Sequence, residues 1–274
     1  MPSLNRMPDQ AHPDTALRPP VPHTVQAIVF DYGNTLIPFG LAEVDRFDIR
    51  LKTFLQQQFG PFDELQYYRI REHDRLAPYQ GNPPAYRESD LNQMVGDLFA
   101  ALYRRASTQA ELQDIIRFRR AVFVEITDMA GETRDILKEL RTEYRLGLLS
   151  NYPDGEAIRH SLRKNKADLL FDAVLVSGDI GLVKPHPEVF RQMLQSLDVH
   201  PSQCLFVGDN WLADVQGARR AGMIACHFTK WVPPERFDPT PEDLLPHATI
   251  RDLSELRLLL PTRTNCQGNI APHG

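Results

Sequence analysis

The sequence predicts an α/β protein whose Rossmann-like core is a parallel sheet with an inserted α-helical domain. After about residue 128, short apolar runs of strand length alternate with amphipathic helical segments. Such alternation with short connections is typical of a parallel sheet covered by helices on both faces. A long stretch with mainly helical periodicity, residues 38–127, separates this part from the first apolar run. A chain of 274 residues is long enough for both parts.

The first strand is expected in VQAIVFD, a continuous apolar run that ends just before a Gly-Asn pair. This pattern is typical of a strand that is covered on both faces. In the inserted stretch, apolar residues recur at helical spacing over residues 44–55 and again over residues 91–102. The proline-rich segment YQGNPPAY lies between these two helical patterns. The insertion is therefore predicted to consist of amphipathic helices with one break.

The alternating part of the chain supplies the remaining core elements. Strands are expected in RLGLLSN, DAVLVSG, QCLFVGD and MIACHF, with helices from about Asp154, through EVFRQMLQSL and through ADVQGARRAG. The predicted core comprises residues 25–37 and 128–261, and the predicted helical cap comprises residues 38–127. Residues 1–24 are rich in proline and residues 262–274 lack periodicity, so we expect a disordered leader and a disordered tail.

Composition limits the classes of partner. The net charge is -5 and the basic residues are scattered, which argues against binding to nucleic acid or to an anionic membrane surface. No apolar run reaches the roughly 18 residues of a transmembrane helix, and the leader does not have the pattern of a signal peptide. Cys204, Cys226 and Cys266 are odd in number and widely separated, which is typical of reduced thiols. We expect a cytoplasmic protein.

Polar residues follow the ends of the predicted strands. In an open parallel sheet, ligands bind beyond the carboxyl ends of the strands, so these positions are where chemistry is expected. Singly, each residue has an ordinary structural interpretation, such as capping a turn or a helix. Together they form one candidate site, which consists of Asp31, Ser150, Asn151, Lys184, Asp209 and Asp214.

This combination of side chains suits phosphoryl transfer through a covalent intermediate. A carboxylate approaches a phosphate dianion only where cations screen the repulsion, so a magnesium ion held by acids and a lysine are both required. Asp31 would attack phosphorus in line and form an aspartyl phosphate, which water then hydrolyses. One difficult step would thereby become two easier ones.

The other members of the candidate site would support this step. Ser150 and Asn151 would orient the phosphoryl group, and Lys184 would neutralise part of its charge. Asp209 would hold the magnesium ion, with Asp214 holding it directly or through water. The predicted partner is therefore a small phosphorylated molecule.

At these residues the sequence resembles the haloacid dehalogenase (HAD) superfamily. The segments FDYGNTL, LLSN, GLVKPHPEVF and VGDNWLADVQGARRAGM are similar, in this order, to the four motifs of the superfamily, over roughly residues 25–255. The resemblance implies a magnesium-dependent hydrolase of small phosphorylated metabolites. It also implies that the backbone carbonyl of Gly33 binds the metal and that the helical insertion is a C1-type cap that closes over the substrate.

Gly33 departs from the pattern of these phosphatases. They usually have a second aspartate at this position, which protonates the leaving oxygen, and such acid catalysis is typically worth about 10² to 10⁴ in rate. The sequence thus predicts an activity that is weakened, that takes its proton from another group, or that needs no proton.

Alternative functions stay open. An L-2-haloacid dehalogenase also lacks the second acid, but its motif resembles DxYGT, whereas Tyr32 directly follows Asp31 here. A metal-free dehalogenase also has no need of Asp209 and Asp214. A noncatalytic binding module of the same fold is suggested only by Gly33. A phosphonatase-like Schiff base is less favoured, because Lys52 is the only lysine early in the cap and has the pattern of a helix surface. A receiver domain is less favoured, because its acidic pair precedes the nucleophile and it has no inserted helical cap.

One further group in the predicted cap is basic. Arg69, Arg71, His73 and Arg75 occur together in YRIREHDRL. They could reach an anionic substrate from the cap, although a solvated helix face is the favoured interpretation.

Overall fold

The core of the protein is a six-stranded parallel sheet. The structure is a computed structural model that describes residues 24–231 and 240–260. The strand order is β3-β2-β1-β4-β5-β6, and all neighbouring strands are parallel. The strands are β1 (Ala27–Phe30), β2 (Arg145–Ser150), β3 (Ala173–Val176), β4 (Cys204–Gly208), β5 (Ile224–Phe228) and β6 (Ala248–Ile250). The predicted α/β class is confirmed, and β6 is a short edge strand that the sequence pattern did not indicate.

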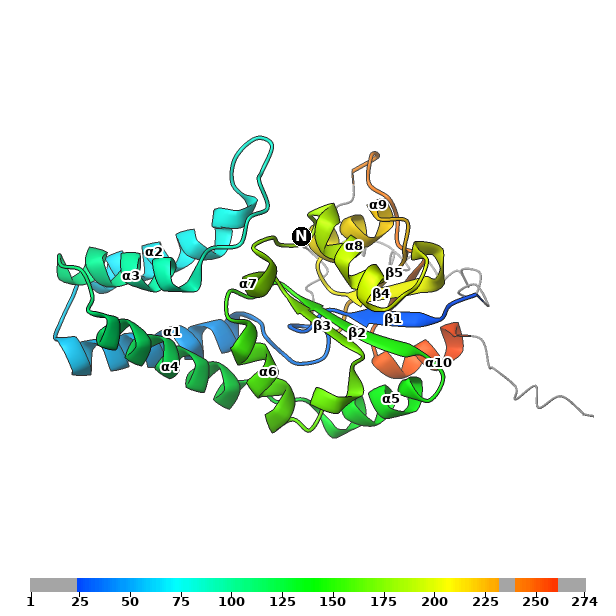
Figure 1. The fold of residues 1–274 in the computed structure, drawn as a ribbon, viewed down its shortest axis with the longest axis horizontal. Coiled ribbons are helices and arrows are strands. Elements are labelled where there is room, and N and C mark those ends of the chain that lie inside the picture. The colour runs from blue at the N-terminus through cyan, green and yellow to red at the C-terminus, as the bar shows by residue number, and fades with distance from the viewer. Residues whose placement is uncertain (1–23, 232–239, 261–274) are drawn as a thin grey trace, which may run out of the picture.

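Helices cover both faces of this sheet. Helices α8 (Pro187–Ser196) and α9 (Gly217–Arg220) lie on one face, while α5 (Gly131–Arg141), α6 (Gly155–Lys164) and α10 (Leu256–Leu259) lie on the other (Figure 1). A short helix, α7 (Ser177–Ile180), directly follows β3.

The central strand β1 shows why the sheet is apolar on both sides. Ala27 and Val29 belong to the apolar cluster beneath α8, whereas Ile28 and Phe30 belong to the cluster that contains α5 and α6 residues. Every residue of β1 is buried. The continuous apolar run in the sequence therefore reflects two covered faces, as predicted.

Four longer helices lie between β1 and α5. They are α1 (Leu41–Phe59), α2 (Glu64–Leu76), α3 (Leu91–Tyr103) and α4 (Gln109–Ile126), and they extend to one side of the sheet (Figure 1). Helices α1 and α4 pack together, with the rings of Phe54 and Phe118 stacked at 4.0 Å between centroids. Side chains of Asp90 and Thr108 accept hydrogen bonds from the first turns of α3 and α4, which explains where these helices begin.

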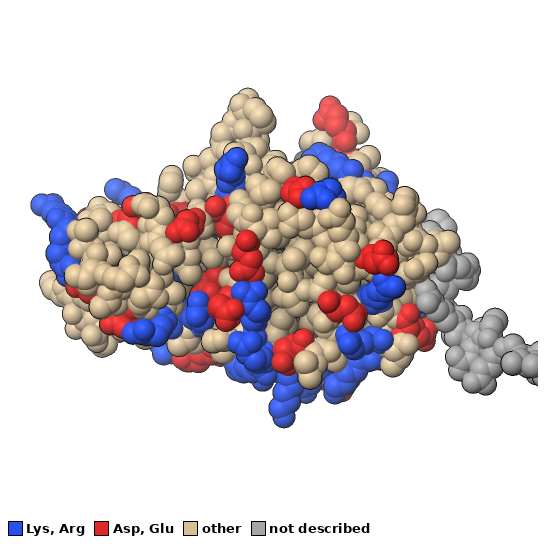
Figure 2. All heavy atoms as spheres, in the orientation of Figure 1, with Lys and Arg blue, Asp and Glu red and all other residues tan. Residues whose placement is uncertain are grey.

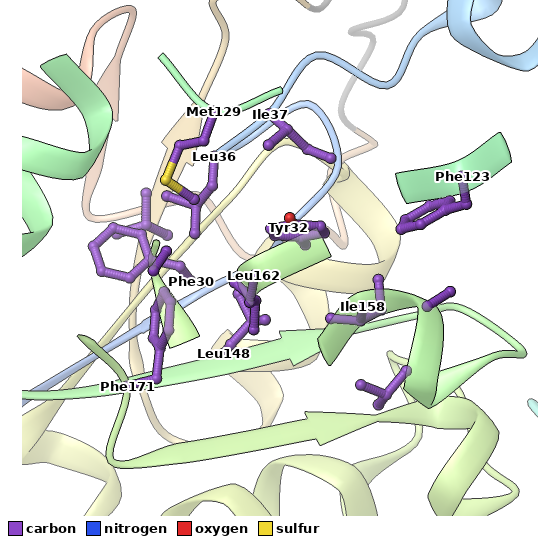
Figure 3. Packing of buried hydrophobic residues seen from close by; sticks show 14 of the residues in the cluster. Phe30, Tyr32, Leu36, Ile37, Phe123, Met129, Leu148, Ile158, Leu162 and Phe171 are labelled. Carbon is purple, nitrogen blue, oxygen red and sulfur yellow. The ribbon is translucent and has the colours of Figure 1, made fainter. Parts of the chain in front are cut away.

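The apolar core is continuous from the sheet into the four inserted helices. Figure 3 shows Tyr32 among these buried side chains, with Phe123 of α4 and Ile158 of α6 nearby. The Tyr32 hydroxyl lies 2.7 Å from Ser161 Oγ, and Ser161 Oγ lies 2.6 Å from Thr127 Oγ1. Tyr32 is thus anchored in the core, and it fixes the loop that follows β1.

Surface charge and the cysteines are two features that bear on the predicted partners. On the face drawn in Figure 2, basic and acidic side chains are interspersed. Among the described residues, no helix is long and apolar enough to cross a membrane. Cys204 and Cys226 are buried free thiols in β4 and β5. Cys266, residues 1–23 of the predicted leader and the whole predicted tail lie outside the described residues.

Candidate active site

The site lies at the carboxyl edge of the sheet, where the strand order reverses around β1. Strand β1 is flanked by β2 and β4, and its last residue, Phe30, pairs with Val207 of β4. The Asp31 N–H then donates to the Val207 carbonyl at 2.9 Å. Because the chain leaves β4 two residues later, Asp209 enters the same region as Asp31.

Lys184 is the central cation of this region. Its Nζ lies 2.7 Å from Asp31 Oδ1 and 2.7 Å from Asp214 Oδ1. Burial disfavours the charged form of Lys184, but the Asp214 and Asp31 carboxylates outweigh burial and raise the pKa of the ammonium group above its ordinary value. Lys184 is therefore charged and held rigidly between two acids.

Asn151 holds the backbone of Lys184. Its Oδ1 accepts from the Lys184 N–H at 2.8 Å, and its Nδ2 donates to the Lys184 carbonyl at 3.0 Å. Nδ2 also donates to the Tyr79 hydroxyl at 2.8 Å. Both amide hydrogens are therefore in use, so the Asn151 side chain positions Lys184 and Tyr79.

Three carboxylates gather beside the lysine. One oxygen from each of Asp31, Asp209 and Asp214 lies within 4.8 Å of the others. The turn that carries Asp214, η4 (Trp211–Gln216), directs this side chain back toward β4, and Asp214 Oδ2 accepts from the Asn210 N–H at 2.9 Å. Gly208 permits this approach, because a Cβ there would lie 2.4 Å from Asp214 Oδ2.

The charge balance of the cluster fits a divalent cation. Burial raises the pKa of Asp209 to about 9, with further contributions from the Asp31 and Asp214 carboxylates. Burial likewise raises the pKa of Asp31 to about 6, against the opposing effect of Lys184. Three acids thus share one ammonium group, and carboxylate oxygens are the ligands that Mg²⁺ prefers.

The structure brings all the predicted site residues to one cavity. This cavity, the phosphoryl cavity hereafter, has a volume of about 210 Å³, and its lining includes Asp31, Gly33, Ser150, Asn151, Lys184, Asp209 and Asp214. Ser150 is buried at the end of β2.

Gly33 is not held in the left-handed region of backbone space. The positive φ of this turn belongs to Asn34, at 54°, whose Oδ1 accepts from the Phe39 N–H at 2.9 Å. A Cβ at position 33 would lie 3.2 Å from Phe39 Cβ. The restriction on a side chain at Gly33 is therefore packing against Phe39 and not backbone strain.

Aromatic residues that the sequence analysis did not select also line the phosphoryl cavity. They are Phe39, Tyr79, Phe123 and Tyr152. The Phe123 and Tyr152 rings lie 4.3 Å apart between centroids, and the Phe39 and Phe123 rings lie 5.4 Å apart. Tyr79 occurs in the segment YQGNPPAY, where the prolines indicated only a break between helices.

A second cavity adjoins the first. This cavity, the helix cavity hereafter, has a volume of about 340 Å³ and shares Phe39, Tyr79, Asn151 and Tyr152 with the phosphoryl cavity. Of the basic group in α2, Arg71 is buried and lines the helix cavity, as does the exposed Arg75. Arg69 and His73 are exposed.

A parallel sheet with helices inserted after its first strand and a lysine surrounded by acids at its edge defines a HAD-type hydrolase. The chain belongs to the haloacid dehalogenase-like hydrolase family, whose model matches residues 70–227. The predicted family and the predicted hydrolase class are therefore confirmed.

Similar proteins include several phosphatases. The N-acylneuraminate-9-phosphatase of Mus musculus is 33% identical over 241 residues, which cover 86% of this chain and 94% of the relative. The Homo sapiens enzyme of the same name is 27% identical over the same coverage. A glyceraldehyde 3-phosphate phosphatase from Pyrococcus furiosus is 27% identical over 116 residues, or 42% of this chain and 47% of the relative.

Solved structures support the same fold. A 2-haloacid dehalogenase from Pseudomonas syringae matches with a TM-score of 0.66 at 24% identity, over 86% of this chain and 97% of that one. The magnesium-bound HAD-hydrolase YfnB from Bacillus subtilis matches with a TM-score of 0.62 at 23% identity, over 86% and 98%. At these identities the likeness establishes the fold.

Proposed function

We propose that this protein is a magnesium-dependent phosphomonoester hydrolase that forms an aspartyl phosphate on Asp31. The observation that carries the proposal is the buried Lys184 ammonium group, 2.7 Å from both Asp31 and Asp214, at the wall of a cavity that also receives Asp209. The phosphatase names of the relatives support the same reaction class. The predicted cytoplasmic location remains part of this proposal.

The acidic cluster would hold the metal. Asp31, Asp209, Asp214 and the Gly33 carbonyl would supply oxygen ligands. When bound, Mg²⁺ would lower the repulsion between Asp31 and the substrate phosphate and stabilise charge on the phosphoryl oxygens. The surplus of negative charge supports this assignment over a metal-free dehalogenase, because a metal-free site has no use for three adjacent carboxylates.

The reaction would proceed in two displacements at phosphorus. An Asp31 carboxylate oxygen attacks phosphorus and the bond to the leaving oxygen breaks, which leaves the phosphoryl group on Asp31. Water then attacks phosphorus, and the bond to Asp31 breaks to release inorganic phosphate. Lys184 neutralises charge through both steps, and Ser150 donates to a phosphoryl oxygen from the end of β2. Asn151 holds Lys184 and Tyr79 in place.

Tyr79 would act as the general acid. In most phosphatases of the family, an aspartate at the position of Gly33 protonates the leaving oxygen, and here Tyr79 would supply that proton. Asn151 donates to the Tyr79 oxygen, so the Tyr79 O–H is directed to another acceptor. Burial raises the pKa of Tyr79, so the hydroxyl keeps its proton at neutral pH. A phenol is nevertheless a stronger acid than an alkyl alcohol, and Tyr79 lies where the two cavities meet. It can therefore protonate a departing alkoxide, and the resulting phenolate would take a proton from the attacking water in the second step, which restores the hydroxyl group.

Phosphate release is the test of this function. Purified protein is assayed against a panel of phosphomonoesters that includes N-acetylneuraminate 9-phosphate and glyceraldehyde 3-phosphate, with Mg²⁺ and with EDTA. We expect release only with Mg²⁺. Equal release in EDTA would overturn the metal assignment. Chloride release from L-2-chloropropionate in EDTA, with no phosphate release from any ester, would establish the dehalogenase alternative instead.

A further inference from the structure

Arg119 is a buried cation that forms no ion pair with any described residue. It lies on α4 with 5% of its surface exposed, and its guanidinium carbon lies 5.3 Å from the centre of the Phe47 ring. Its Nη1 is completely buried and has no hydrogen-bond acceptor among the described residues. Within that same part of the chain, no ion pair involves Arg119.

The nearby acids are engaged elsewhere or lie out of reach. Asp48 accepts from Arg71 Nε at 3.0 Å and from Arg75 Nη1 at 2.9 Å. Asp74 lines the same cavity, but its buried Oδ2 has no hydrogen-bond donor among the described residues and lies 4.0 Å from Arg71 Nη1. Among the described residues that line the helix cavity, Arg119 thus has an unsatisfied buried donor and Asp74 an unsatisfied buried acceptor.

An unpartnered buried guanidinium group is unfavourable for the protein alone. Taking a charge out of water costs several kcal/mol unless a counter-charge and hydrogen bonds replace the water. Burial and the neighbouring Arg71 lower the pKa of Arg119 to about 10, so it is still charged at neutral pH. An anionic group of a bound ligand can therefore serve as the counter-charge for Arg119.

The helix cavity is the place for such a ligand. Besides Arg119, its lining includes Val44, Phe47 and Met94, which suit a carbon chain. Its volume of about 340 Å³ is roughly that of eleven water molecules, enough for a chain of about six carbons with its hydroxyl groups. Because Tyr79 and Asn151 line both cavities, a molecule bound here can reach the phosphoryl cavity.

We propose that the substrate is a phosphorylated hydroxy acid, whose carboxylate pairs with Arg119 while its phosphoryl group lies at Asp31. This inference rests on the proposed function and specifies its substrate class. A hydroxyl of the carbon chain donates to Asp74 Oδ2. A carboxylate fits better than a second phosphate, because Asp74 and Glu88 also line the cavity and would repel a dianion.

The test compares substrates that differ only in the carboxylate. One pair is 6-phosphogluconate and sorbitol 6-phosphate, and the other is 3-phosphoglycerate and glycerol 3-phosphate. With Mg²⁺, the parent protein is expected to prefer the acid of at least one pair by about 10- to 100-fold in kcat/KM, as a charged hydrogen bond allows. In Arg119→Met this ratio is expected to fall toward one.

The control variant is Arg117→Met, on the same helix. Arg117 has 69% of its side chain exposed and pairs only with Asp114 among the described residues, so the acid preference is expected to persist there. Loss of the preference in both variants would indicate a general electrostatic effect and would overturn the assignment to Arg119.

Two further measurements separate this inference from the proposed function. Binding of each pair to Asp31→Asn is measured by calorimetry, with Arg119→Met added in the same background. If the parent hydrolyses nothing but the Arg119-dependent preference remains in binding, the inference stands and the proposed function fails. If the parent hydrolyses acid and neutral esters equally well, the inference fails and the proposed function stands.

The melting temperature gives a readout that does not depend on any substrate. Without ligand, Arg119→Met is expected to melt at or above the temperature of the parent, because it removes an unpartnered buried charge. A clear decrease in the melting temperature would show that Arg119 serves the fold, through Asp74 or another group, and would overturn the inference.

Discussion

Two buried cations, in adjoining cavities, differ in one respect. Lys184 lies 2.7 Å from each of two carboxylates, whereas Arg119 has no carboxylate within ion-pair distance among the described residues. The first cavity therefore has a surplus of negative charge and suits a metal ion. The second offers a buried cation that forms no ion pair with the described residues, and it suits an anion. Under the proposed function, the protein would build the reacting end of its site from its own side chains, and the substrate would complete the other end.

The largest expected effect comes from removing the proposed nucleophile. Asp31→Asn is expected to lower turnover with Mg²⁺ by about 10⁴-fold or more, because the variant lacks the carboxylate that would form the covalent intermediate. The melting temperature without metal is expected to stay near that of the parent or to rise, because Lys184 keeps Asp214 and the acids repel one another less. A variant that retained most of its activity would show that Asp31 is not the nucleophile.

The next largest effect is on stability, where Lys184 and Arg119 are expected to differ. Lys184→Met leaves Asp31 and Asp214 buried without their cation, so we expect a loss of about 3 to 5 kcal/mol in the free energy of unfolding without Mg²⁺. Arg119→Met is expected to change the same quantity in the opposite direction or not at all. Urea titrations of both variants provide the measurement. If both variants changed the free energy of unfolding by the same amount in the same direction, the proposed difference between the two cations would be wrong.

Magnesium is expected to bind at the phosphoryl cavity and not at the helix cavity. At 100 times its dissociation constant, Mg²⁺ is expected to stabilise the protein by about 2.7 kcal/mol, and the shift should be lost in Asp209→Asn but kept in Arg119→Met. Thermal melts with Mg²⁺ and with EDTA give the shift.

The same melts have an expected pH dependence. Without metal, burial raises the pKa of Asp209 from 3.8 to about 9, so the folded state favours the protonated acid. Its contribution to stability is present below about pH 4 and is lost as the pH rises toward 9. The stabilisation by Mg²⁺ is therefore expected to grow between pH 6 and pH 9. A shift that was constant over this range would contradict the assignment of Asp209 to the metal site.

The smallest effects concern the leaving group. Tyr79→Phe is expected to slow hydrolysis of alkyl phosphates by about 10- to 100-fold, and of aryl phosphates much less, because a phenolate leaves without a proton.

Gly33→Asp is expected to raise the rate on alkyl phosphates by about tenfold. In the double variant with Tyr79→Phe, it is expected to restore part of the rate that Tyr79→Phe loses. Crowding by Phe39 limits this gain. Rates plotted against the leaving-group pKa give the comparison, and a slope unchanged by Tyr79→Phe would exclude Tyr79 as the acid.

The phosphoryl cavity could be predicted from the sequence because its residues follow strands. An apolar run that ends in a polar residue identifies a strand end, and a parallel sheet brings all such ends to one edge. Asp31, Ser150 and Asp209 were found in this way, and the structure places them at one cavity. The use of the Asn151 amide to hold Lys184 could not be predicted, since it depends on the path of the loop after α7.

The helix cavity was harder to predict because it forms where several helices meet. In α4, Arg119 occupies the same stripe as Ile115, Ile116, Val122 and Phe123, all of which are buried. An arginine within an apolar stripe was thus the signal that could have identified it. Periodicity shows which face of a helix is buried, but it does not show which residues of other helices meet that face. Arg71 was assigned to a solvated face for the same reason, and the structure shows that it is buried.

Trapping a phosphoryl mimic on Asp31 is the most direct test of whether Asp31 is a magnesium-dependent phosphoryl acceptor. Beryllofluoride is added to the protein with Mg²⁺, and the bound species is observed by ¹⁹F NMR. We expect bound beryllofluoride resonances in the parent protein that are lost in EDTA and absent from Asp31→Asn, but retained in Arg119→Met. No bound signal in the parent, or one that persists in Asp31→Asn, would contradict the assignment of Asp31 as the phosphoryl acceptor.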